Sequence, residues 1–514
     1  MLRFRNKVTA AVLSAALFAA MVCAPSLTEP AFAASDKGLS VNSAVMRTGS
    51  TLKLKVKGAK KDVKWKTSDK KIATVKSVKG KYGQTAVIKA GKKAGKCRIT
   101  VKYGKKKQTC TIRTIKLSKA TKELTASVKA GKAKRAGGGT AFRKAAADFS
   151  FEILRQTAAQ DAAEGKTVNT LVSPDSILTA LVMVENGAKG KTLREMQDAL
   201  SGGISVSDYN RYLSGLNYRL TSSKTVKYHV ANSIWTRKGA VRLKKKFLKK
   251  NKTYHNAQIF SAPFSKATVK DMNRWVEGNT SGMIKKILSR LTKDDRVVLI
   301  NAIAFEGRWT QEFSDPQKEL FTTDKGASKK VDTLLQRDRM DYITVNGGKG
   351  FAKPYRGGKI AFVGLLPPEG STVDEYLAGL KGSEFITAWK GRKSRLLDIS
   401  VPEFKYDYSA SMAVPLKRMG MRTAFTDSAN LSGMIASSSP EKGIRIDDVL
   451  HKTHIELDKH GTKAAAATAV IAKSGCAPLK EEVTEIHLDR PFVYVLVDTK
   501  TGIPLFAGIL RYVK

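Results

Sequence analysis

The stretch Gly461-Thr462-Lys463-Ala464-Ala465-Ala466-Ala467-Thr468-Ala469 is a long run of small residues between two segments with the pattern of core strands. Residues 449–457 alternate between apolar and polar side chains, and residues 491–497 form a short apolar run typical of a buried strand. Because alanine is the best helix former, the run fits a surface helix or a mobile linker. It also fits a strand that enters a sheet, because its alternate residues are small: Thr462, Ala464, Ala466 and Thr468.

Residues 1–34 have the pattern of a secretory signal peptide. Three basic residues precede the apolar stretch Val8–Cys23, and the triplet Ala31-Phe32-Ala33 resembles a cleavage site. We therefore expect a secreted protein that is extracellular or associated with the cell surface. No later stretch approaches about 18 consecutive apolar residues, so no membrane span is expected.

Residues 35–117 show short alternating runs separated by turns, the pattern of a small all-β sandwich. In Val63–Val75 a run containing Trp65 is followed by a polar turn and then by Ile72-Ala73-Thr74-Val75. This segment resembles the bacterial immunoglobulin-like (group 2) domain. The resemblance implies an immunoglobulin-like sandwich at the N-terminal end of the mature chain.

The net charge of +49 is concentrated near the N-terminus. Residues 36–140 hold 31 Lys and Arg against 4 Asp and Glu, a net charge of +27, whereas residues 141–514 hold 59 against 39, a net charge of +20. Such a density attracts polyanions over roughly a Debye length. For an exported protein, the expected partner of residues 35–140 is an anionic cell-wall polymer or an acidic glycan, and not nucleic acid. A solubilising surface without a specific partner is the alternative.

Two cysteines of the sandwich segment lie on neighbouring alternating runs. Pairing these runs about Tyr103–Lys106 places Cys97 opposite Cys110, and an exported protein can form a disulfide there. Residues 118–140 follow with few large apolar groups and end in three glycines, so we expect a Lys/Gly-rich linker that lets the flanking domains move independently.

Residues 141–514 begin with helix-period segments and continue with strand-like ones, the order expected of an α+β domain. Several motifs in this region, in this order, resemble those of the serpin family. The strongest is Leu299-Ile300-Asn301-Ala302-Ile303-Ala304-Phe305-Glu306-Gly307-Arg308-Trp309. The others are Asn169–Ile177 followed by Asn186–Thr192, Asn273–Val276 with Thr280 and Ile284, Leu416 with Met419–Met421, Ala424–Phe425, Ala429–Gly433, Pro491–Phe492 and Pro504–Gly508.

The resemblance implies a serpin fold of three β-sheets, about nine helices and an exposed reactive centre loop. It also implies a suicide inhibitor, which forms a covalent acyl-enzyme with a target serine protease and traps it by inserting the cleaved loop into its own sheet. The hinge of that loop would be Gly461, Thr462, Lys463, Ala464, Ala465, Ala466, Ala467 and Thr468. Lys463 lies on the outward parity, so it does not oppose insertion.

Further site residues follow from the same resemblance. Ser173, Ser176, Asn301 and His451 match the polar cluster over which the sheet opens. Trp309 matches the residue beneath the point where the loop begins to insert. Near that point the family usually has Glu and Lys or Arg where this chain has Lys459 and Glu403, so the resemblance implies an ion pair with its charges exchanged.

The loop length typical of the family places the reactive bond at Gly475–Cys476. The small residues around it suit an elastase-like or subtilisin-like protease. Cleavage after Lys480 or Lys473, which would mean a trypsin-like target, is the alternative. A non-inhibitory serpin-fold binding protein, localised by its basic domain, is another.

The sequence offers no sign of an enzyme. It has no Gly-x-Ser-x-Gly elbow and no His-Glu-x-x-His motif, and Gly190-Lys191-Thr192 lacks the earlier glycine of a phosphate loop. On a strand, His451 and His454 point to opposite faces, so no metal site is expected there. We expect neither a catalytic residue nor a cofactor.

Overall fold

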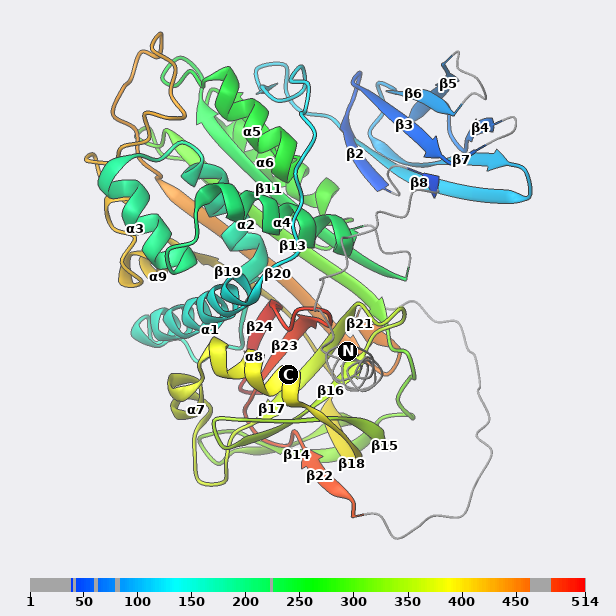
Figure 1. The fold of residues 1–514 in the computed structure, drawn as a ribbon, viewed down its shortest axis with the longest axis vertical. Helices are drawn as coiled ribbons and strands as arrows, with labels where there is room; N and C mark the ends of the chain where they lie inside the picture. Colours follow the sequence, from blue (N-terminus) through cyan, green and yellow to red (C-terminus); the bar gives the residue numbers. More distant parts are fainter. Residues whose placement is uncertain are drawn as a thin grey trace, which may run out of the picture. The chain divides into compact units, whose positions relative to one another are not determined.

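The fold was analysed in a computed structural model that describes residues 38–39, 43–59, 63–78, 84–221, 225–462 and 482–513 (Figure 1). All of them lie in one compact unit, residues 37–514. The expected signal peptide, the reactive bond at Gly475–Cys476 and hinge residues 463–468 lie outside the described residues.

The described residues between 38 and 115 form a β-sandwich of two four-stranded sheets, which is the fold class that the sequence predicted. Alternate apolar residues of both sheets, such as Leu54, Ile88, Ile99 and Ile112, are fully buried between them. The assignment to the bacterial immunoglobulin-like group stays a prediction. One sheet has the order β1 (Gly38–Leu39), β3 (Thr51–Lys57), β6 (Thr85–Ala90) and β5 (Ala73–Ser77), and the other β2 (Ser43–Arg47), β8 (Lys106–Ile115), β7 (Gly95–Tyr103) and β4 (Val63–Thr67).

The predicted pairing of Cys97 with Cys110 is wrong in register. The hairpin turns tightly at Gly104, whose φ is +53°, so Cys97 lies opposite Ile112 and Cys110 lies opposite Ile99. Both cysteines are buried free thiols. They are diagonal neighbours on one face, farther apart than the short Cβ···Cβ distance that a disulfide needs.

Residues 118–140 are not a free linker, because the chain is bound to the following domain along most of this segment. β9 (Lys122–Glu123) forms the edge strand of a sheet by pairing with β12 (Gln258–Ala262). The buried carboxylate of Asp271 accepts the N–H of Ser118 at 2.9 Å and the hydroxyl of Thr121 at 2.7 Å. The composition of the segment did not predict this contact, because backbone groups and two hydroxyls form most of its hydrogen bonds.

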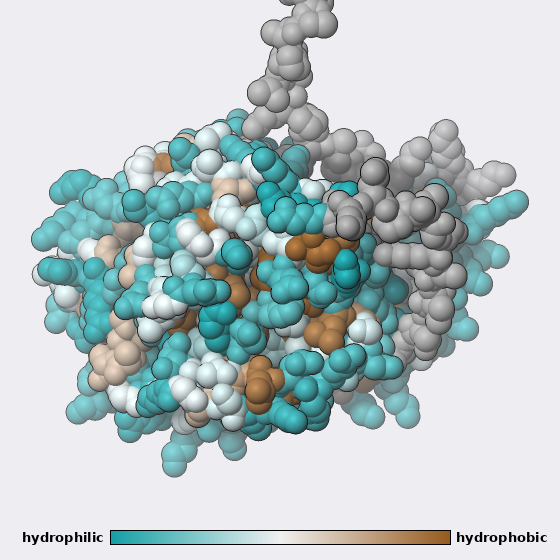
Figure 2. Space-filling view, turned by 90° about the horizontal axis from the view of Figure 1, so that it is seen from below, coloured by the Kyte–Doolittle hydropathy of each residue, from teal (hydrophilic) through white to brown (hydrophobic). Residues whose placement is uncertain are grey.

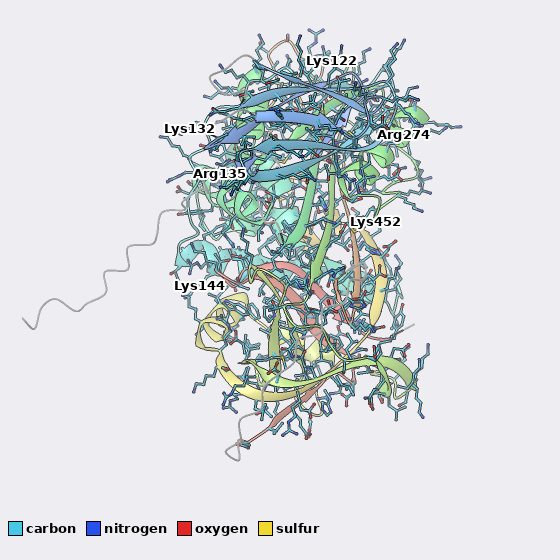
Figure 3. All side chains as sticks on the ribbon, turned by 90° about the vertical axis from the view of Figure 1, so that its right-hand side faces the viewer. Lys122, Lys132, Arg135, Lys144, Arg274 and Lys452 are labelled. Atoms are coloured by element: carbon cyan, nitrogen blue, oxygen red, sulfur yellow. The ribbon has the colours of Figure 1, made fainter. Side chains whose placement is uncertain are left out.

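The rest of the segment continues along the same surface. The N–H of Gly131 donates to Thr253 Oγ1 at 2.8 Å, and the guanidinium of Arg135 stacks over Tyr218 at 4.1 Å. Lys122, Lys132 and Arg135 mark its course in Figure 3.

Nine α-helices occur among the described residues, and α1, α2 and α3 lie in the part of the chain where helix-period segments were expected. Their bounds are α1 (Thr140–Ala163), α2 (Pro174–Glu185), α3 (Gly190–Ser201), α4 (Val206–Thr221), α5 (Lys245–His255), α6 (Lys266–Asn279), α7 (Val373–Gly379), α8 (Gly382–Gly391) and α9 (Ala413–Arg418). α2 is buried along its whole length, consistent with its apolar sequence Ile177–Val184.

A seven-stranded sheet runs through the middle of the domain (Figure 1). Its order is β19 (Phe404–Ser411), β20 (Asp448–Asp458), β21 (Gly461–Thr462), β13 (Val297–Arg308), β11 (Val226–Arg237), β12 and β9. α2 contacts one face of β11 and β13, where Leu299 and Ile303 belong to the main core. The other face carries Val298, Ile300 and Ala302, which pack with Trp275 of α6 in a separate core.

A nine-stranded sheet makes up the rest of the domain. The resemblance implied three sheets in all, and here two of them are joined because β15 is 18 residues long and pairs with strands of both. The order is β10 (Thr170–Val172), β24 (Pro504–Leu510), β23 (Phe492–Asp498), β17 (Ile360–Leu366), β16 (Gly348–Pro354), β15 (Ser328–Val345), β18 (Lys393–Pro402) and β22 (Thr484–His487), with β14 (Gln317–Thr322) paired to β15. The predicted α+β fold is confirmed.

The surface is largely hydrophilic. Figure 2 shows hydrophilic residues over most of the face that it presents, with small separate hydrophobic groups. Among the described residues, only Val78, Leu320 and Val414 are exposed large hydrophobic residues. None of the described helices combines the length and the apolar character that a membrane span requires.

The docking of residues 118–125 can be tested at Asp271. Asp271→Ala removes the acceptor for Ser118 and Thr121, and loss of hydrogen bonds to a charged group costs roughly 2–3 kcal/mol. We expect faster amide hydrogen exchange at residues 118–125, measured by mass spectrometry. Glu277→Ala, at an exposed position of the same helix, is the control. Unchanged exchange in Asp271→Ala would show that the segment is held by other contacts.

Candidate functional site

β13 and β20 separate at one end, and β21 occupies the space between them. The two long strands pair in parallel from Val298↔Asp448 to Ala304↔His454. Beyond this point Thr462 lies opposite both Gly307 and Leu457, so β21 is antiparallel to each neighbour. The first two residues of the small-residue run are therefore already part of the sheet.

Gly461 is required by the backbone at this place. Its φ is +150°, and a Cβ atom would lie 2.0 Å from the carbonyl oxygen of Gly307. The chain reaches this position through a turn held by Asp458, whose carboxylate accepts the N–H groups of His460 at 2.8 Å and Gly461 at 3.0 Å. A side chain at 461 would push β21 away from β13.

Thr462 directs its side chain into the core. Its Oγ1 lies 2.6 Å from the hydroxyl of Tyr355, and the residue is only 1% exposed. Burial raises the pKa of Tyr355 far above its usual range, so this hydroxyl stays protonated. Thr462 therefore lies on the core side of β21.

Trp309 lies directly beneath β21, where the resemblance placed it. The indole N–H donates to the carbonyl of Asp458 at 3.0 Å, and the backbone N–H donates to the carbonyl of His460 at 3.0 Å. The ring stacks on Tyr355 with centroids 4.3 Å apart and meets Phe313 edge-on. Trp309 therefore binds the turn that precedes the run.

The sequence analysis did not identify a buried lysine, Lys353, that lies next to the aromatic rings around Trp309. Lys353 is 3% exposed, its ammonium lies 4.0 Å above the Phe313 ring, and it donates to the amide of Gln336. Burial lowers the pKa of Lys353 to about 7. Its position in the otherwise apolar stretch Gly350–Pro354 was the available signal.

The predicted ion pair between Lys459 and Glu403 is wrong in its partners. Glu403 accepts the backbone N–H of Lys459 at 3.1 Å, while the ammonium of Lys459 forms an ion pair with Asp315. Burial raises the pKa of Glu403. The two residues are adjacent as expected, but the turn presents the amide of Lys459 to Glu403 and directs its side chain outward.

The four residues of the predicted polar cluster meet at the centre of the sheet. His451 receives the backbone N–H of Ser173 at its Nε2 at 3.1 Å, and its Nδ1 lies 2.5 Å from Asn301 Oδ1. The amide of Asn301 donates to Ser176 Oγ at 2.5 Å. All four side chains are buried. The cluster thus links β13 and β20 to the start of α2.

Sequence reasoning missed a fifth member, Asn232. Its Oδ1 accepts from the amide of Asn301 at 2.6 Å and from the hydroxyl of Ser176 at 3.2 Å. An asparagine inside the strand segment 226–237 was the signal that could have identified it.

His451 is neutral in this setting. Burial disfavours the charged ring and lowers the pKa of His451 to about 3. Because Nε2 accepts from Ser173, the ring proton is on Nδ1 and points to Asn301. Protonation of Nε2 would break the bond to Ser173.

This arrangement links β13 and β20 through hydrogen bonds between buried side chains. Among the described residues no cluster of three or more His, Cys, Asp or Glu could hold a metal ion. His454 points to the outer face of β20, where it pairs with Asp407, and is thereby separated from His451. The geometry is that of a sheet that closes around two residues of an inserted segment.

The chain is similar to known proteins in both sequence and structure. The family model described as "Serpin (serine protease inhibitor)" matches residues 144–513. An uncharacterized serpin-like protein of Thermococcus kodakarensis is 30% identical over 371 residues, 70% of this chain and 83% of that protein. Leukocyte elastase inhibitor A of Mus musculus is 31% identical over 382 residues, 70% and 96% of the two chains. The native state of the thermophilic serpin tengpin matches with a TM-score of 0.71 and 34% identity over 76% of this chain and all of that one.

The first prediction for this site concerns how the free energy of unfolding depends on pH. The unfolded chain protonates His451 near pH 6.5, whereas the native state keeps it neutral down to about pH 3, so this group's contribution to stability falls as pH drops through that window. In His451→Gln we expect the acid-side loss of stability to be shallower by up to about 1.4 kcal/mol per pH unit. Denaturant unfolding between pH 7 and about pH 4 measures it. His454→Gln, on the outer face of the same strand, should keep the wild-type decline, and an identical decline in His451→Gln would reject a neutral His451.

A second prediction distinguishes the observed contact of Glu403 from an ion pair. Glu403→Ala leaves the N–H of Lys459 without its acceptor and is expected to lower the melting temperature more than Lys459→Ala does. Glu403→Gln keeps an acceptor and should retain most of the stability. Equal losses in Glu403→Ala and Lys459→Ala would support the ion pair instead.

Proposed function

Because this chain belongs to the serpin family, we propose that it is a secreted suicide inhibitor of serine proteases that traps the acyl-enzyme by inserting its cleaved loop between β13 and β20. The observation that carries this proposal is β21, whose two residues are hydrogen-bonded to both strands. The run that follows has the composition that further insertion requires.

The register of β21 fixes which residues would meet during insertion. Continued along β13 and β20, it would bring Ala464 between Phe305 and Ile455, and Thr468 between Asn301 and His451. The core-side positions hold only small or medium residues: Ala464, Ala466, Thr468, Val470, Ala472 and Ser474. For the strand to enter, the hydrogen bond between the side chains of Asn301 and His451 would have to break. The hydroxyl of Thr468 would then replace it as a hydrogen-bonding partner.

The chemistry of trapping requires only an accessible peptide bond from this chain. The protease serine attacks the carbonyl carbon of Gly475, the bond to the nitrogen of Cys476 breaks, and the new amine of Cys476 takes the proton. Insertion of the freed segment would then move the attached protease away before water can release it. A native state held by a kinetic barrier is the physical requirement for this sequence of events.

The small residues around Gly475–Cys476 support an elastase-like or subtilisin-like target, and the likeness to leukocyte elastase inhibitor A points the same way. A trypsin-like target cut at Lys473 or Lys480 is the second candidate. We further propose that the signal-like segment directs export and that the basic region 35–140 holds the inhibitor at an anionic cell-wall polymer or acidic glycan.

Incubation with elastase-, subtilisin- and trypsin-like proteases tests the proposal. We expect an SDS-stable complex with one of them and release of a fragment that begins at Cys476. A fragment beginning after Lys473 or Lys480 would assign the trypsin-like target. Degradation without complex formation would reject inhibition.

Two adjacent alanines provide a matched test of insertion. Ala466→Arg puts a cation on the core side, next to Ile303 and Thr453, and is expected to turn the inhibitor into a substrate that is cleaved without forming the complex. Ala465→Arg makes the same change on the outer side and should retain most complex formation. Equal behaviour of the two variants in a stoichiometry titration would contradict the register.

A further inference from the structure

One face of the sandwich carries many exposed basic side chains. The outward positions of β4, β7 and β8 that α6 leaves uncovered hold six basic residues and three threonines, without a carboxylate or an apolar side chain. We call this surface the basic face, and its exposed cations are Lys64, Lys66, Lys96, Arg98, Lys102 and Lys107. Thr100, Thr109 and Thr111 occupy the remaining positions.

The register places like charges directly opposite one another on this face. Lys102 lies across from Lys64 on one side and from Lys107 on the other. Directly opposed like charges destabilise a sheet. Folding therefore does not account for this row, and a threonine at any of the three positions would suit the sandwich better.

The other sheet of the same sandwich shows that the chain can avoid such pairs. It also carries exposed lysines, but Lys53 and Lys76 both face Val87, and Lys89 faces Thr51 and Thr74. The opposed cations are thus a property of the basic face and not of the high lysine content.

No carboxylate of the described residues is paired with a lysine of this row. Within the part of the chain that the structure describes, none of the six cations of the basic face forms an ion pair. Among the described residues, the acidic residue nearest to this face in sequence is Asp69, which accepts the backbone N–H of Lys71 at 2.8 Å and so closes the turn after β4. An external polyanion would relieve the repulsion within this row.

We propose that the basic face binds a linear acidic polysaccharide. Neighbouring strands place cations about 4.8 Å apart across the sheet, and alternate residues place them roughly 6.8 Å apart along it, so one flat face presents charges in two directions. The three threonine hydroxyls lie among these cations and offer donors and acceptors to sugar hydroxyls. Flexible lysine side chains, as point charges, follow such a polymer without requiring one fixed geometry.

The composition of the face favours a polysaccharide over nucleic acid. Single-stranded nucleic acid binds by stacking its bases on aromatic side chains, and the outward positions of the basic face hold none. Duplex DNA is read by a helix or a two-stranded ribbon that enters its groove, whereas this surface is the flat face of a multi-stranded sheet.

The proposal rests on the localising role suggested for residues 35–140 and names its surface and ligand class. It is independent of protease inhibition, because the basic face and the β13–β20 gap lie on different sheets.

The test compares two triple variants of the full chain with equal loss of charge. Lys64→Thr, Lys102→Thr and Lys107→Thr together remove the opposed row, whereas Lys53→Thr, Lys76→Thr and Lys89→Thr together remove three lysines from the other sheet. Binding to immobilised polygalacturonate is measured at physiological salt, with neutral dextran and an oligothymidylate of matched charge as comparison ligands. We expect the first variant to lose at least about tenfold in affinity and the second to stay within about twofold.

Stability provides the second readout. Removal of the opposed lysines should leave the melting temperature of the first variant unchanged or raise it, so that the loss of binding cannot come from unfolding. Equal loss of affinity in both variants, or oligothymidylate binding as tight as that of polygalacturonate, would overturn the proposal. Both variants should keep wild-type protease complex formation; if no form of the protein forms that complex while polygalacturonate binding holds, the inhibitor function alone is rejected.

Discussion

The pairing of β13 with β20 is the interaction on which the rest of this structure depends. The two strands are directly hydrogen-bonded along most of their length, yet they separate at one end around the two residues of β21. Under the proposed mechanism, this sheet has to stay closed in the intact protein and still be able to accept a strand. Asn301 and His451, with Ser173 and Ser176, join the two strands by hydrogen bonds between buried side chains. Such bonds can be exchanged for those of an incoming strand at small net cost.

The residues at the open end follow from this constraint. Gly461 permits a backbone approach that no side chain would allow, and Asp458 turns the chain so that Thr462 faces Tyr355. Trp309 fixes the turn from below with its indole N–H. Together these groups set the register of β21 against β13 and β20. Because side chains alternate across a strand, that register would decide which residues of the run have to be small under the proposed insertion.

Much of this could be predicted from the sequence, and the failures have specific physical causes. The helix periods, the alternation of β20 and the motif ending at Trp309 gave the fold and the polar cluster. The cysteine register failed because the turn residues are Gly104 and Lys105, whereas pairing Cys97 with Cys110 would need a turn centred one residue earlier along the chain. The partners of Lys459 and the docking of residues 118–125 failed because Asp315 and Asp271 are distant in sequence and no periodicity links them to their partners. Lys353 was missed because burial of a lysine among aromatic rings leaves only an unusual residue in an apolar stretch.

The basic sandwich and the sheet of β13 and β20 are governed by different constraints within one chain. In the sandwich an unfavourable arrangement of charge is retained on one face, and in the larger domain two strands of a sheet are separated at one end.

Hydrogen exchange of residues 463–475 before and after cleavage at Gly475–Cys476 tests the central claim most directly. Insertion between β13 and β20 predicts that these amides gain strong protection once the bond is cut. Exchange as fast in the cleaved protein as in the intact one would contradict it.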